Sequence, residues 1–318
     1  MQRAITATFL RASAARPAAS AAASAPRAVG ARVGGVPVSI AAAARGDGLR
    51  AQFLNQAPRA MQFSSSSSKP KPTVFDGLEG LSQYYARCSG RTGIFEKYER
   101  NDVFPPNSFR FSNFLLFTKL QLPPNTEIDA IDFLNGAQFA CDLVMNTMYS
   151  REFINFACGA ISESKAANHL KLGLSTECYE AFLFAMNETS KSGNTFDLKQ
   201  LDINGVYLVG VEYEHLTLAE YKAEQLVATT SSQAKQEGND KAAKADPPAA
   251  GPEIDPEDYK TFVERMRMDV QFETKEHLEV QTADGQNQSI ARESSAVWRF
   301  ESLVTTPDDI DWKIVSVV

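Results

Sequence analysis

Acidic residues are missing from the first 46 positions of this 318-residue chain, which hold six arginines and many Ala and Ser residues. The segment opens with MQRAITATFLRASAAR, in which a short helix can separate apolar side chains from Arg3 and Arg11. An acid-free, Arg-rich, weakly amphipathic N-terminus is typical of a mitochondrial transit peptide. The interspersed arginines and prolines exclude the apolar core of about 7–15 residues that a secretory signal needs. We expect a transit peptide over 1–63, cleaved after Arg59; a plain Ala-rich tail is the alternative.

Other absences limit the kinds of catalytic and metal sites that the sequence can form. The four cysteines lie far apart without a CxxC pair, which is typical of reduced thiols in a reducing compartment. The three histidines are isolated, so no metal-ligand spacing occurs. No apolar run approaches the roughly 20 residues that span a bilayer. The GxSxG, HExxH, P-loop and Rossmann glycine patterns are missing as well. The sequence therefore predicts no catalytic set, no metal and no cofactor, hence no enzyme.

Basic residues are scarce once the expected transit peptide is set aside. The whole chain holds 32 Lys and Arg against 39 Asp and Glu, and residues 69–318 hold 24 against 38, a net charge of −14. Proteins that bind nucleic acid usually carry a basic footprint, and anionic lipids attract basic patches. We therefore expect no direct binding of nucleic acid. Any attachment to a membrane therefore has to come from local segments of the sequence and not from the net charge.

One such feature is the apolar segment 109–122, which lies between two Pro-Pro pairs. Eight Phe and Leu side chains fall within these 14 residues. The segment is too short to span a membrane, but it suits an interfacial helix whose rings enter the acyl boundary while basic side chains meet headgroups. The alternative is a segment packed on the protein's own core, because an apolar run of this length is ambiguous. The expected membrane contacts are Phe109, Arg110, Phe111, Phe114, Phe117 and Lys119.

The hydrophobic period predicts helices first and strands afterwards. Residues 69–106 are polar and punctuated by Gly and Pro, and a helical period begins near residue 126, with Asn125 or Thr126 as the cap. Further helices are expected over 150–166 and 175–188. After Gly193 the period becomes two, so strands are expected near 206–213, 265–280, 297–300 and 312–317.

A segment without hydrophobic periodicity, 229–258, interrupts the strand region and is rich in Pro, Ala and Gly. It is predicted to be a disordered insertion. Helices followed by an antiparallel meander are typical of an α+β domain rather than of βαβ units.

Two blocks of sequence resemble a known family. FLNGAQFACDLV and LSTECYEAFLFAMNET resemble the helical half of the family of the inner-membrane translocase subunit forty-four. MRMDVQFETKEHLEV, VWRFESL and DWKIVSV, with Trp298 and Trp312, resemble its sheet half. The resemblance implies a cone-shaped, nuclear-transport-factor-two-like domain over 126–318, in which two to three helices pack on a twisted antiparallel sheet. Residues 64–125 then form an N-terminal extension.

The family also implies an apolar pocket that can accept an acyl chain or an apolar peptide segment. The pocket residues are expected to be Phe133, Met145, Phe182, Trp298 and Phe300. Asp142, Tyr149, His169 and Tyr179 are the titratable residues near it that could act as a general acid or base. Isolated titratable residues are weak indicators of a site, so ordinary surface or rim positions are expected for them.

The resemblance implies a matrix-side protein, peripheral to the mitochondrial inner membrane. One branch of the family anchors the import-motor chaperone at the translocase, and another, which includes the ribosomal large-subunit protein forty-five, docks the mitochondrial ribosome at the membrane. The long charged helical region of the first branch is missing here, and RTGIFEKY weakly resembles the second. The expected partners are inner-membrane lipid and either the import translocase or the mitochondrial ribosome.

Two alternatives remain open. A small matrix enzyme of the same cone fold would have a deep polar pocket that contains a buried carboxylate or histidine. A structural subunit of a respiratory or ribosomal assembly would use the domain only to fill a surface.

Overall fold

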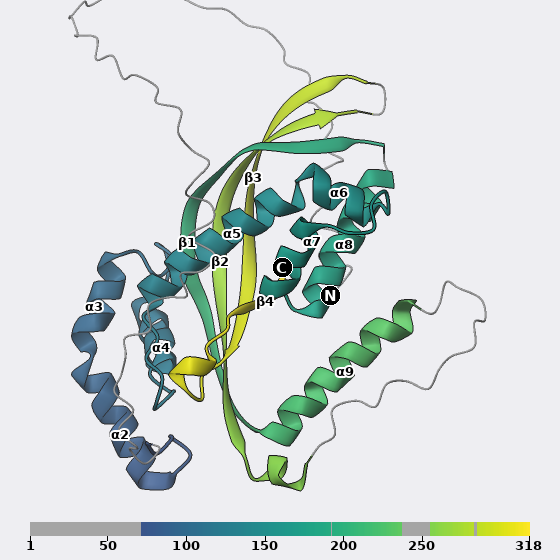
Figure 1. Ribbon diagram of the computed structural model, residues 1–318. Coiled ribbons are helices and arrows are strands. Elements are labelled where there is room, and N and C mark those ends of the chain that lie inside the picture. Colours follow the sequence, from purple (N-terminus) through teal and green to yellow (C-terminus); the bar gives the residue numbers. More distant parts are fainter. Residues whose placement is uncertain (1–70, 192, 237–254, 283–284) are drawn as a thin grey trace, which may run out of the picture. The chain divides into compact units, whose positions relative to one another are not determined.

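The computed structural model describes residues 71–191, 193–236, 255–282 and 285–318, all within one compact unit. The expected transit peptide 1–63 lies outside the described residues. Helices come first and a four-stranded antiparallel sheet follows, so the α+β class is confirmed (Figure 1).

The helices that precede the sheet pack on one side of it or at its ends. In chain order they are α2 (Gly77–Gly90), α3 (Thr92–Arg100), α4 (Arg110–Leu120), α5 (Ala130–Met148), α6 (Arg151–Ala157), α7 (Lys165–Gly173) and α8 (Thr176–Lys191).

The central helix α5 starts later than the sequence predicted. Its cap is Asp129, whose carboxylate accepts a hydrogen bond from the backbone N–H of Ile131. Thr126, one of the expected caps, instead donates its hydroxyl to the carbonyl of Val304 over 2.8 Å. The helix expected over 150–166 is too long: α6 ends at Ala157, close to Gly159 with its left-handed φ of +74°, and the next helix, α7, begins only at Lys165.

Residues 71–125 do not form a separate extension, contrary to the predicted division at residue 125. Helices α2 and α3 occupy a stretch that the sequence indicated only as polar and punctuated by Gly and Pro. Phe95 and Tyr98 of α3 are buried and belong to the same hydrophobic core as Leu134 of α5 and Met268 of the sheet. The first part of the described chain is therefore an integral layer of the domain.

The sheet is a simple meander in the order β1-β2-β3-β4. Its strands are β1 (Thr195–Thr217), β2 (Phe262–Gln281), β3 (Asn287–Leu303) and β4 (Lys313–Val317). Strand β1 is much longer than predicted, because three irregularities in its pairing with β2 interrupt the alternation of side chains that marks a strand in sequence. They fall between Leu198 and Gln200, between Ile203 and Gly205, and between Leu208 and Gly210.

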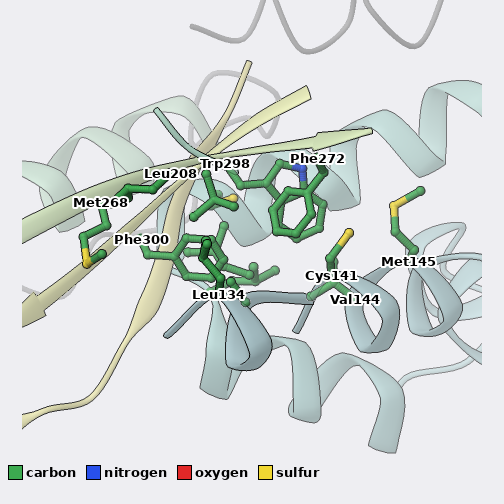
Figure 2. Close-up of a cluster of buried hydrophobic side chains, with 14 of the residues drawn as sticks. Leu134, Cys141, Val144, Met145, Leu208, Met268, Phe272, Trp298 and Phe300 are labelled. Carbon is green, nitrogen blue, oxygen red and sulfur yellow. The ribbon is translucent and has the colours of Figure 1, made fainter. Parts of the chain in front are cut away.

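The inner face of β2 forms the centre of the core, as its alternation predicted. Met266, Met268, Val270 and Phe272 are all buried, and α5 lies across them. Figure 2 shows the contact layer, in which sheet residues face side chains of α5. The labelled residues are Leu134, Cys141, Val144, Met145, Leu208, Met268, Phe272, Trp298 and Phe300.

The outer face of β2 carries an ion-pair network that α9 (Leu218–Gln236) partly covers. Arg265, only 3% exposed, pairs with Glu214 of β1 and with Glu224 of α9, the latter at 2.6 Å. Arg267 reaches Glu301 at 2.7 Å. The first arginine of this charged strand face is therefore buried.

The predicted insertion 229–258 is too long at both ends. Helix α9 continues to Gln236, and a short 3₁₀ helix, η4 (Pro256–Tyr259), precedes β2. The Asp258 carboxylate of η4 is buried and pairs with Lys222 of α9 at 2.6 Å. Residues 237–254, the remainder of that prediction, lie outside the described residues.

Replacement of Thr126 by valine is expected to lower the free energy of unfolding by about 1–2 kcal/mol, because the buried carbonyl of Val304 loses its hydrogen-bond donor. Thr118→Val is the matched control, since the Thr118 hydroxyl donates within its own helix, to the carbonyl of Leu115, in an exposed hydrogen bond. Urea denaturation measures both changes. Equal effects would contradict a special role of the bond between residues 126 and 304.

Candidate functional site

The apolar segment 109–122 divides into a buried and an exposed side. Helix α4 places Asn113, Phe117 and Leu120 at helical spacing against the core. Phe117 is 0% exposed, with its ring centroid 5.5 Å from that of Phe95 and 6.1 Å from that of Tyr98. The predicted lipid contact of Phe117 is therefore wrong, because no part of this side chain reaches the surface. For this side of α4, the alternative of a segment packed on its own core is correct.

The opposite side of α4 is open. Phe109, Phe111 and Leu115 are 73%, 60% and 45% exposed. Arg110 is exposed as well and forms an ion pair with Glu99 at 3.0 Å, and Lys119 is exposed at the last turn. Phe114 is half-buried, with its ring edge-on to that of Phe95 at 5.4 Å. Of the six expected membrane contacts, four are thus freely accessible and one is partly so.

Helix α2 adds exposed apolar residues that the sequence reasoning missed. Leu78, Leu81 and Tyr85 follow the spacing of one helix side, and all three are more than half exposed. The helix is joined to α4 and its following turn by two hydrogen bonds: Tyr84 Oη donates to the carbonyl of Thr118, and Arg87 Nη1 donates to that of Pro123, each over 3.0 Å. The α2–α4 surface is defined here as Leu78, Leu81, Tyr85, Phe109, Arg110, Phe111, Leu115 and Lys119.

This surface lies in the part of the chain that is not acidic. Residues 71–122 carry seven Lys and Arg against five Asp and Glu, whereas residues 123–318 carry 16 against 33. The exposed apolar side chains of this surface therefore lie in the weakly basic part of the chain.

A buried carboxylate lies beneath α2. Glu264, on the inner face of β2, is 4% exposed, and its burial raises its pKa from the ordinary 4.5 to about 7. Tyr213 and the guanidinium of Arg87 are close enough to oppose that rise. The ring of Phe75, which precedes α2, stacks on His215 with the centroids 5.2 Å apart.

The predicted apolar pocket is only partly assembled. Met145, Phe182 and Trp298 line a cavity of about 60 Å³ beneath the sheet. Phe133 and Phe300 do not line it, because the ring of Phe133 packs edge-on against that of Phe300 at 5.5 Å and against that of Trp312 at 4.8 Å. Small-molecule sites usually measure about 300–1,000 Å³, so this cavity has room for a few waters but not for an acyl chain.

One end of the cavity is polar and contains another buried carboxylate of β2, Glu276, which is 1% exposed. Tyr149 Oη lies 3.2 Å from Glu276 Oε2, and Arg292 Nη2 and Ser294 Oγ lie 3.1 and 3.3 Å from Oε1. Burial and the neighbouring carboxylate raise the pKa of Tyr149. The carboxylate therefore faces three donors, an arrangement that holds β2, β3 and the end of α5 together.

The sequence offered a signal for Glu276 that was not used. It follows Phe272 and Thr274 on the same side of β2, so the strand period alone places it inward. Of the four titratable candidates, only Tyr149 contacts this carboxylate. Asp142 and His169 are exposed, and the Tyr179 hydroxyl is buried without a hydrogen-bond partner among the described residues.

Over the described ranges, no three His, Cys, Asp or Glu side chains gather in a way that could hold a metal ion. All four cysteines are free thiols. No helix of the described chain is long and apolar enough to cross a membrane.

Neither a known protein family nor a curated protein matches this sequence. The resemblance to the translocase-subunit family therefore stays a prediction.

Stability is expected to depend on pH through Glu264. The folded chain keeps this carboxyl protonated up to about pH 7, whereas an unfolded chain releases the proton near pH 4.5. The contribution to the free energy of unfolding is complete below pH 4.5 and is lost as the pH rises through 7. Urea denaturation of wild type and Glu264→Gln over this range should show the loss in wild type only. A variant with the same pH slope as wild type would contradict the assignment.

Removal of the Glu276 charge is expected to be costly. Glu276→Gln leaves the Arg292 guanidinium beside a neutral group in the core, which should lower the free energy of unfolding by about 3 kcal/mol. Glu279→Gln, which removes an exposed partner of Lys199, should change it by less than about 0.5 kcal/mol. If Glu276→Gln were more stable than wild type, the residue would resemble a catalytic group kept at the expense of stability.

Proposed function

We propose that this chain is a non-enzymatic binding module that attaches peripherally to the matrix face of the mitochondrial inner membrane through the α2–α4 surface. Its role would be in protein import or in docking the mitochondrial ribosome at the membrane during insertion of new chains. The observation that carries the proposal is the exposure of Phe109, Phe111 and Leu115 in the weakly basic part of an acidic domain.

The physical basis of this proposal is the behaviour of side chains at the interface between a membrane and water. Exposed Phe, Leu and Tyr side chains gain free energy when they enter the boundary between headgroups and acyl chains, and nearby Arg and Lys side chains meet the phosphates. Arg110 and Lys119 supply such charges next to the exposed rings of α4. The acidic remainder of the domain is repelled by anionic lipid, which favours one orientation of the protein on the membrane.

The choice between translocase and ribosome rests on resemblance alone. The segment RTGIFEKY, which weakly resembles the ribosomal branch, covers most of α3, and both Phe95 and Tyr98 within it are buried. These side chains serve the core, so their presence supports neither partner. The localisation in the matrix rests on the expected transit peptide 1–63.

A small matrix enzyme is the second candidate, and Glu276 is the observation that favours it. A buried carboxylate beside Tyr149 is the kind of pocket group such an enzyme would need. Against it stand the three donors that already face the carboxylate and the small volume of the adjoining cavity. We therefore favour the binding module.

Vesicle flotation tests the membrane proposal. Phe111→Ser with Leu115→Ser should lower the bound fraction of the full chain on phosphatidylcholine–cardiolipin vesicles by about tenfold or more, since each apolar side chain contributes about 1.5–3 kcal/mol when buried. Phe139→Ser with Leu143→Ser on α5 is the matched control, with the same spacing and 62% and 42% exposure. The control should bind as wild type does.

An equal loss in both double variants, or none in either, would contradict a specific role of α4. Sedimentation of gently solubilised mitochondria then separates the partners, because co-migration with the large ribosomal subunit or with the translocase distinguishes the two roles. Co-migration with neither would leave lipid attachment as the whole function.

A further inference from the structure

A cavity of about 450 Å³ lies at the free edge of the sheet, away from both sites described above. It is bounded by the turn after α3, by the N-terminal half of α5 and by the middle of β1, three segments that Figure 1 places together. Its volume falls within the range of about 300–1,000 Å³ that is typical of ligand sites. Its apolar lining comes from Val103, Ile131, Leu134, Ile203 and Val206.

The strand that lines this cavity has unused backbone groups. Strand β1 is an edge strand, and the N–H of Leu208 points away from β2 and donates to the carbonyl of Val103 over 2.8 Å. Pairing with β2 is regular from Gly205 to Leu208, so the N–H and C=O of Val206 point the same way. No described residue hydrogen-bonds to either group. Edge groups of this kind are a template for an added strand.

Three amide side chains surround the same space. Asn135 and Gln138 on α5 and Asn204 on β1 are exposed, and none has a hydrogen-bond partner among the described residues. A primary amide offers one acceptor and two donors, which is the complement of a peptide group. Asn101 differs, because its Nδ2 already donates to the carbonyl of Lys97 over 2.7 Å.

The rim of the cavity carries one negative charge. Asp102 has a φ of +51°, a left-handed conformation that is uncommon outside glycine, and its exposed carboxylate forms no ion pair with a described residue. A basic side chain on a ligand would find its counter-charge here.

We propose that this cavity binds an extended polypeptide segment as an additional strand on β1, with a basic residue of the segment near Asp102. The unused backbone groups of Val206 select a polypeptide over other ligands, because they pair with the backbone of any extended chain. The inference does not depend on the membrane proposal, since the cavity shares no residue with the α2–α4 surface.

Selection of random dodecapeptides on phage against the full chain, without vesicles, tests this proposal. The enriched peptides are synthesised with a fluorescent label and their Kd is measured by polarisation. Val206→Pro removes the outward N–H, and proline is tolerated at such a position of an edge strand. It should weaken binding by about tenfold, while the control Val206→Ala, which keeps the N–H, should stay within about threefold of wild type.

Alternate N-methylation of the selected peptide gives a second measurement that needs no variant of the protein. In an added strand, the N–H groups of every second residue face β1. N-methylation of those residues should therefore abolish binding, and N-methylation of the alternate residues should not. This series decides the question if Val206→Pro lowers the thermal stability of the chain.

Several results would overturn the proposal: no enriched peptide, unchanged Kd with Val206→Pro in a folded chain, or equal effects of both N-methylated series. Phe111→Ser with Leu115→Ser should bind the peptides as wild type does. Failure of peptide binding with normal flotation would therefore leave the membrane proposal intact, and the reverse result would leave the cavity proposal intact.

Discussion

The inner face of β2 has to be covered along its whole length, and most of the fold follows from that requirement. A strand of 20 residues is about 66 Å long, while the 19 residues of α5 span only about 28 Å. One helix therefore covers the centre, where Met266 to Phe272 are buried, and other elements have to cover the ends. The two buried carboxylates of β2, Glu264 and Glu276, lie on the same strand face just outside this apolar centre.

On each side of this apolar centre the inner face of β2 carries a buried carboxylate. Glu276 meets Tyr149, which directly follows α5, whereas Glu264 lies beneath α2 near Arg87. Glu276 faces three hydrogen-bond donors, whereas Glu264 Oε2 is buried without a hydrogen-bond partner among the described residues. The sheet thus determines which side of α2 and α4 packs on the core. The opposite side of these helices carries exposed Leu, Phe and Tyr residues.

The sheet half could be predicted because strand alternation in β2 is regular. The length of strand β1 was underestimated because its three irregularities interrupt the alternation of side chains between the two faces. Helices α2 and α3 were missed, because their few buried residues lie among polar and Gly positions. Phe117 and Phe111 look equivalent in sequence, and only the helical period, applied residue by residue, assigns one to the core and the other to the surface.

The hydrogen bond from Thr126 to Val304 joins residues 178 positions apart, and the core likewise mixes α3 and α4 with strands from the end of the chain. Contacts of such long range are closed late in folding. While the chain is synthesised from its N-terminus, Phe95 and Phe117 emerge long before β2 and β3 exist to bury them. During that interval the nascent segment exposes both of its apolar sides, which makes it prone to aggregation.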